Sequence, residues 1–152
     1  MIINSDENIT ACTFFGHRDA PVEIQPLLEK VIIDLIENYK VKKFYIGNNG
    51  NFDILVKNTL KKVKEKYQHI EYLIVLAYFP TQRNEFDYSN YSNTIYFNEL
   101  SSVPKKLAIY KRNEIMLKKS YFVVTYVKHS FGGAAIFKEL AEKQNKHIIN
   151  IT

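Results

Sequence analysis

FYIGNNGNFD, residues Phe44–Asp53, is the segment from which the architecture of this chain is most directly read. It opens with an apolar run, passes through two glycines and three asparagines, and continues into apolar residues at helical spacing. Glycine adopts backbone angles that other residues avoid, and asparagine tolerates such angles better than most residues do. The segment therefore predicts a β-strand, a tight turn and the first turn of a helix.

The same transition occurs at two more places. The chain has only five glycines, and each directly follows or soon follows an apolar run: they are Gly16, Gly47, Gly50, Gly132 and Gly133. Every glycine is thus placed between a predicted strand and the helix after it.

The apolar pattern of the whole chain repeats this alternation. Continuous apolar runs predict strands over Ile9–Phe15, Lys43–Ile46, Tyr72–Tyr78, Tyr121–Val127 and His147–Ile151. Apolar residues at helical spacing predict helices over Pro21–Tyr39, Asn51–Tyr67, Pro104–Lys119 and Gly133–Asn145. Strands that are apolar throughout are covered on both faces. We therefore expect an α/β fold, Rossmann-like and doubly wound, with a mostly parallel sheet and helices on both faces.

Length and composition indicate one domain. The 152 residues, 46% of them hydrophobic, suit a single core over 1–152, with residues 1–8 as a flexible lead. The lone Cys12 excludes an internal disulfide and is expected to be buried. There is no apolar run long enough to span a membrane and no signal peptide, so a cytoplasmic protein is expected. The net charge of +5 permits a nucleic-acid partner but does not require one, because lysines on solvated helix faces account for it.

The turns after parallel strands meet at one edge of the sheet, where ligands of such folds bind. Helix N-termini at this edge present free N–H groups and a positive dipole end, which attract phosphate. We expect a small-molecule nucleotide or a related phosphate ligand there, with no cofactor and no metal. The predicted ligand-binding residues are Gly16, His17, Arg18, Gly47, Asn48, Asn49, Gly50, Asp53, Arg112, Gly132 and Gly133.

Three charged residues near this edge each allow two readings. Arg18 either binds an anion or forms a surface pair with Asp19. Asp53 either caps the helix that begins at Asn51 or accepts a hydrogen bond from a ribose or base. Arg112 falls on the apolar side of its helix, so it needs a partner such as Asp53 or a bound anion, unless its long side chain reaches out to solvent.

The long polar and aromatic segment over residues 80–98 is unusual for a simple connection. Within it, Thr94–Phe97 is the best candidate for a further strand. Because the segment is rich in tyrosine and phenylalanine, we expect it to act as a lid or binding loop that stacks on a base.

Three motifs together resemble the SLOG superfamily of Rossmann-like proteins, which includes the LOG phosphoribohydrolases and the DNA-processing protein DprA. They are FFGHR, FYIGNNGNFD and YKRNEIMLKKSYFVVTYVKHSFGGAAIFKEL, in an order and spacing similar to the short single-domain GHR-motif branch, across about residues 10 to 151. The resemblance implies a nucleotide-derived ligand at the glycine edge. It also implies a catalytic pair in the LOG enzymes, whose arginine and glutamate positions match Arg112 and Glu139.

The chain departs from the LOG pattern after its paired glycines. Ala135 and Ile136 stand where those enzymes have glycine and threonine, and on a helical wheel Glu139 falls toward the polar side. Binding or sensing of a nucleotide is therefore the first expectation. The alternative is a nucleoside 5′-monophosphate phosphoribohydrolase with Arg112 and Glu139 as catalytic residues. Single-stranded nucleic-acid binding ranks third, and a homodimer is one option for the oligomeric state, since relatives often form dimers.

Overall fold

The computed structural model describes residues 9–79 and 93–152. The predictions for residues 1–8, and those for residues 80–92 of the aromatic segment, lie outside the described residues.

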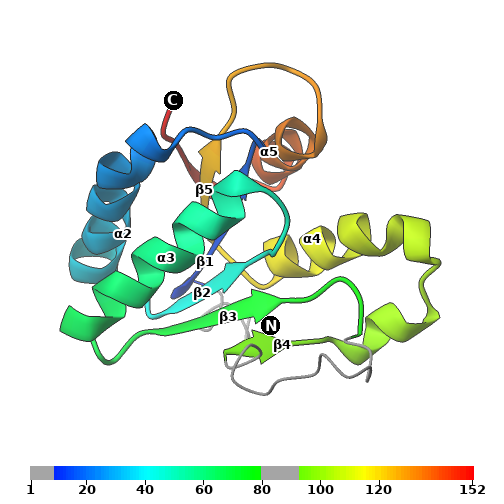
Figure 1. The fold of residues 1–152 in the computed structure, drawn as a ribbon, viewed down its shortest axis with the longest axis horizontal. Coiled ribbons are helices and arrows are strands. Elements are labelled where there is room, and N and C mark those ends of the chain that lie inside the picture. Colours follow the sequence, from blue (N-terminus) through cyan, green and yellow to red (C-terminus); the bar gives the residue numbers. More distant parts are fainter. Residues whose placement is uncertain (1–8, 80–92) are drawn as a thin grey trace.

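The centre of the fold is a six-stranded sheet in the order β4-β3-β2-β1-β5-β6 (Figure 1). Every neighbouring pair of these strands is parallel. The strands are β1 (Ala11–Gly16), β2 (Lys43–Ile46), β3 (Glu71–Val75), β4 (Thr94–Ile95), β5 (Phe122–Tyr126) and β6 (His147–Asn150).

Two helical layers enclose the sheet (Figure 1). The long helices are α2 (Gln25–Tyr39), α3 (Asn51–Lys66), α4 (Ala108–Lys118) and α5 (Gly133–Lys143). The short 3-10 helices are η1 (Val22–Ile24), η3 (Asn98–Ser102) and η4 (Lys105–Leu107). Helices α2 and α3 pack on one face of the sheet and α4 and α5 on the other. The predicted doubly wound α/β fold is confirmed.

Strand β1 shows why continuous apolar runs were needed. Cys12 and Phe14 belong to the core beneath α2 and α3, whereas Ala11 and Phe15 belong to the core beneath α4 and α5. Successive side chains of a strand point to opposite faces, so a central strand covered on both sides is apolar at most positions. The buried Thr13 of β1 is accommodated because its hydroxyl donates to the Tyr45 carbonyl at 2.9 Å.

Some predicted boundaries were wrong. The helix expected from Pro104 is a 3-10 turn over Lys105–Leu107 followed by α4 from Ala108, since Leu107 leaves the helical backbone region (φ −106°, ψ 0°). Strand β3 ends at Val75, and β4 is the two residues that pair with it, Thr94–Ile95. These strands end where hydrogen-bonded pairing with the neighbouring strand ends, and the periodicity of the sequence carries no information on that pairing.

The connections reverse direction between β1 and β5. Strands β2 to β4 extend to one side of β1, and β5 and β6 extend to the other. In open parallel sheets the loops diverge at such a reversal and leave a crevice outside the carboxyl ends of the strands. Among the described residues, no helix combines the length and apolar character needed to cross a membrane.

Candidate functional site

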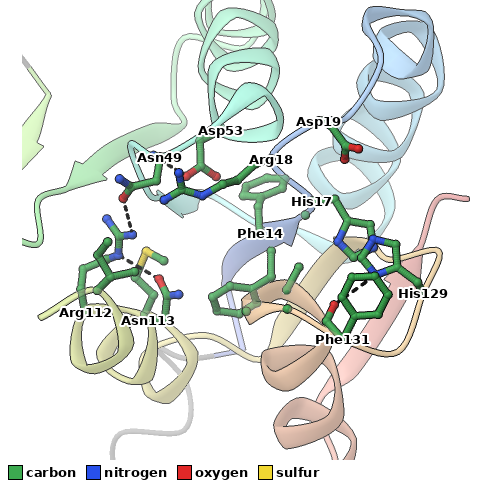
Figure 2. Close-up of a pocket in the computed structure, with 17 residues that line it drawn as sticks. Phe14, His17, Arg18, Asp19, Asn49, Asp53, Arg112, Asn113, His129 and Phe131 are labelled. Atoms are coloured by element: carbon green, nitrogen blue, oxygen red, sulfur yellow. Dashed lines mark hydrogen bonds between the residues drawn. The ribbon is translucent and has the colours of Figure 1, made fainter. Parts of the chain in front are cut away.

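A cavity of about 320 Å³ lies at this reversal (Figure 2). Its walls come from the end of β1 and the loop after it, the turn after β2 with the first turn of α3, one side of α4, and the loop after β5 with the start of α5. The predicted residues that line it are Gly16, His17, Arg18, Asn49, Asp53, Arg112, Gly132 and Gly133. Gly47 and Asn48 instead line a neighbouring cavity of about 200 Å³, which Asp53 also borders. The three glycine turns thus converge on one edge of the sheet.

The glycines of the first two turns make room for the protein's own side chains. A Cβ at Gly16 would stand 2.2 Å from the ring of Phe52, and one at Gly47 would stand 2.8 Å from Asp53 Oδ2. Gly50 has a φ of +91°, and a Cβ there would stand 2.9 Å from the Cα of Arg18. Internal packing therefore accounts for all three.

The third turn is different. Gly132, the N-cap of α5, needs its glycine for a φ of +95°. Gly133 has no such backbone requirement, and a Cβ built there would meet no heavy atom within 4 Å among the described residues. Gly133 is the first residue of α5 and lines the cavity. Because it has no side chain, the N-terminus of the helix is open toward the cavity.

Arg112 is an interior cross-link. Its side chain is 2% exposed, so it does not reach out to solvent as one reading allowed. Nε donates to Asn113 Oδ1 at 2.8 Å and Nη2 donates to Asn49 Oδ1 at 2.9 Å. Nη1 donates to Asn48 Oδ1 at 3.1 Å and to the Val75 carbonyl at 2.8 Å. A guanidinium has five N–H groups, so four are used within the fold.

These hydrogen bonds tie α4 to the turn after β2 and to the end of β3. Burial lowers the pKa of Arg112, and the nearby charge of Asp53 opposes that shift. The partners expected for this buried cation, a carboxylate or an anion, are largely replaced by neutral amide and carbonyl oxygens.

Asp53 fixes the turn from the other side. Its Oδ2 accepts a hydrogen bond from the Asn49 N–H at 2.8 Å, just before the start of α3. Burial raises the pKa of Asp53 to about 6, although the Asn49 N–H and the charges of Arg112 and Arg18 favour ionisation. A carboxyl group that gives up its proton near neutral pH therefore borders the cavity.

Arg18 is the accessible cation of the cavity. Its side chain is exposed at the wall, close to Asp53 and opposite the open end of α5 (Figure 2). Within the described part of the chain it makes no ion pair with Asp19, the alternative considered from sequence, and no side-chain hydrogen bond. Its charge is available to a guest.

A column of three rings forms the opposite wall (Figure 2). His17 stacks on His129 with ring centroids 3.7 Å apart and planes 12° apart. His129 stacks on Phe131 at 3.9 Å and 17°. The loop after β5 is thereby held against the end of β1.

His17 is neutral in this arrangement. Its Nε2 accepts a hydrogen bond from the Lys128 N–H at 2.9 Å, which requires an unprotonated nitrogen. Burial lowers the pKa of His17, and the neighbouring His129 lowers it further, while Asp19 acts in the opposite direction. On His129, Nδ1 lies 3.1 Å from the Phe131 carbonyl, which can only accept, so Nδ1 donates.

The site predicted from the sequence omits part of the wall, and its motif match included Glu139, which the helical wheel put on the polar side of α5. His129, Phe131 and Asn113 were not assigned to the site, although the rule that ligands bind at the reversal would have pointed to the loop after β5. Glu139 does not line this cavity: it lies in the second turn of α5 on its exposed side, opposite the buried Phe137 and Ala141. The predicted catalytic pair of Arg112 and Glu139 is therefore not brought together.

Comparison of this chain with protein-family models and with curated proteins gives no match. The likeness to the SLOG superfamily accordingly stays a prediction made from the three motifs themselves.

Proposed function

We propose that the cavity between the ends of β1 and β5 binds a small phosphate-bearing molecule of the nucleotide class. The observation that carries this proposal is that Arg18, exposed and without a side-chain hydrogen bond or ion pair in the described part of the chain, faces the open N-terminus of α5 across one cavity. The N–H groups of a helix start and its positive dipole end attract anions, and an arginine supplies a forked donor for phosphate oxygens.

The size and lining of the cavity agree with such a ligand. A volume of about 320 Å³ lies at the lower end of the range for small-molecule pockets. The wall combines apolar side chains, such as Phe14 and Met116, with a few polar groups, as ligand pockets commonly do. A nucleoside monophosphate offers both kinds of surface.

Within this proposal the two arginines have different roles. Arg18 contacts the phosphate, because its donors are uncommitted. Arg112 is a positioning residue that holds the turn carrying Asn49 and Asp53, because its donors are already used. Asp53 accepts a hydrogen bond from a ribose hydroxyl, since a carboxylate there would repel the phosphate itself.

The geometry favours binding over hydrolysis. Cleavage by the mechanism that the resemblance implies would need a carboxylate at Glu139 in contact with the ligand, and this side chain is exposed outside the cavity. We also favour a small ligand over single-stranded nucleic acid, since Arg18 borders a cavity of about 320 Å³, a size that suits one small molecule.

Thermal-shift measurements over a panel of nucleoside mono-, di- and triphosphates test the proposal, because a ligand that binds only the folded state raises its melting temperature. We expect at least one member to raise it, and Arg18→Gln to abolish most of the shift. Lys61→Gln is the matched control, since it removes the same charge from an exposed position in the third turn of α3. No shift with any member at millimolar concentration, or equal effects of the two variants, would contradict the proposal.

A further inference from the structure

The ring column ends in an aromatic side chain that the fold leaves uncovered. Phe131 is 69% exposed, although one face of its ring stacks on His129 at 3.9 Å. A phenylalanine that is covered on one face and yet keeps most of its surface exposed has its other face open. The exposed ring lines the same cavity as Arg18 and Gly133.

The position of this ring is fixed from the sheet outward. The His17 backbone N–H donates to the Tyr126 carbonyl at 3.1 Å, and the His17 ring lies edge-on to that of Tyr126. The Lys128 N–H donates to His17, and His129 donates to the Phe131 carbonyl. The two histidine rings are therefore each restrained by a hydrogen bond, whereas the Phe131 ring is restrained by its stack on His129 and by the hydrogen bond to its own backbone carbonyl (Figure 2).

A planar ligand binds more tightly to a rigid aromatic side chain than to a mobile one, because less side-chain conformational freedom is lost on binding. Bases stack on such side chains with little regard to their identity, since every base presents a π-face. The open face of Phe131 suits a planar ring, which would become the fourth ring of the column.

We propose that Phe131 is the base-stacking platform of the site, so that the pocket selects phosphate ligands that carry a heteroaromatic base over sugar phosphates that lack one. This inference rests on the proposed function, and it identifies the loop after β5 as the element that determines specificity. The anion is bound by Arg18 and α5 in either kind of ligand, while only a base gains from the column.

Calorimetric titration of the full chain with AMP and with ribose 5-phosphate tests this inference. We expect AMP to bind about 5- to 150-fold more tightly, the range that corresponds to one stacked base. Phe131→Ala should reduce the affinity for AMP to near that for ribose 5-phosphate and leave the latter unchanged. Phe131→Trp should retain or increase the preference for AMP.

Phe79→Ala is the matched control. Phe79 is 65% exposed, close to the exposure of Phe131, but it contacts Tyr96 edge-on and does not line this cavity. This variant should bind both ligands as the parent protein does. Unfolding curves of both alanine variants confirm that they are folded, which the exposure of the replaced rings leads us to expect.

The outcomes separate this inference from the proposed function. If AMP and ribose 5-phosphate both bind, but their ratio is unchanged in Phe131→Ala, the platform is wrong and the phosphate site stands. If neither ligand binds at millimolar concentration and no member of the nucleotide panel raises the melting temperature, both proposals are wrong.

Discussion

The guanidinium of Arg112 lies directly against the backbone of Gly47. A Cβ at Gly47 would stand 3.1 Å from Arg112 Cζ and 2.8 Å from Asp53 Oδ2. Neither neighbour can move freely, because Arg112 makes four hydrogen bonds and Asp53 binds the Asn49 N–H. The absence of a side chain at Gly47 thus leaves room for both Arg112 and Asp53 to pack against this turn.

Gly47→Ala should therefore destabilise the protein by about 1 to 3 kcal/mol, the usual cost of forcing an extra carbon into a packed site. Gly133→Ala is the control for stability, since a Cβ there meets no described heavy atom within 4 Å. Urea unfolding of the two variants measures the difference. Equal stabilities would contradict the packing described around Gly47.

Replacing Arg112 should lower the free energy of unfolding, because this residue is proposed to position the turn after β2 and not to contact the ligand. Arg112→Met removes the donors of four hydrogen bonds and leaves the carbonyl of the buried Val75 without this donor, at an expected cost of about 2 to 4 kcal/mol. Lys111→Met, at the neighbouring exposed position of α4, should cost less than about 0.5 kcal/mol, because its ion pair with Glu114 is at the surface. A similar small cost for both variants in urea unfolding would refute the cross-link.

Asp53 should make stability depend on pH in the acidic range. Its pKa rises from 3.8 to about 6 on folding, so the folded state holds the proton more tightly than the unfolded state between these values. The free energy of unfolding should consequently fall by up to about 3 kcal/mol as the pH rises from about 4 to about 6, and the contribution should be constant above that. Asp53→Asn should lack this component. Parallel pH profiles for the two proteins would be the contrary result.

His17 should act with the opposite sign. Its pKa is lowered on folding, so its contribution to stability is complete above the ordinary value of 6.5 and is lost as the pH falls through the lowered pKa. Protonation would also break the hydrogen bond from the Lys128 N–H. His17→Gln should have a lower free energy of unfolding than the parent protein at pH 7.5. Between pH 7 and pH 5 its free energy of unfolding should fall less than that of the parent. His69→Gln, at an exposed site, serves as control and should keep the parental profile.

The order of the strands and helices, and the edge of the sheet at which the site lies, could be predicted from the sequence, because both follow from local patterns. Continuous apolar runs indicated covered strands, and the glycines marked the turns that converge on one edge. The partners of Arg112 could not be read in this way, since Asn48 and Asn49 lie more than 60 positions earlier in the chain and meet it only through the crossover of α4. The stack of His17 on His129 likewise depends on the adjacency of β1 and β5.

For Glu139 two predictions from the sequence disagreed. The motif match made it a catalytic candidate, whereas the helical wheel put it on the polar side of its helix, and the structure agrees with the wheel, since Glu139 is exposed while Phe137 faces the core. Residue identity at a matched spacing therefore did not suffice to place this side chain in the cavity.

The location of a bound nucleotide is the most direct test of the central claim. Titration of ¹⁵N-labelled protein with AMP, followed by amide chemical shifts, should move the signals of Gly132, Gly133 and Ala134 at the start of α5, together with that of Arg18. Shifts confined to the opposite edge of the sheet, around Lys40, Lys42 and His69, where a separate cavity lies, would contradict it.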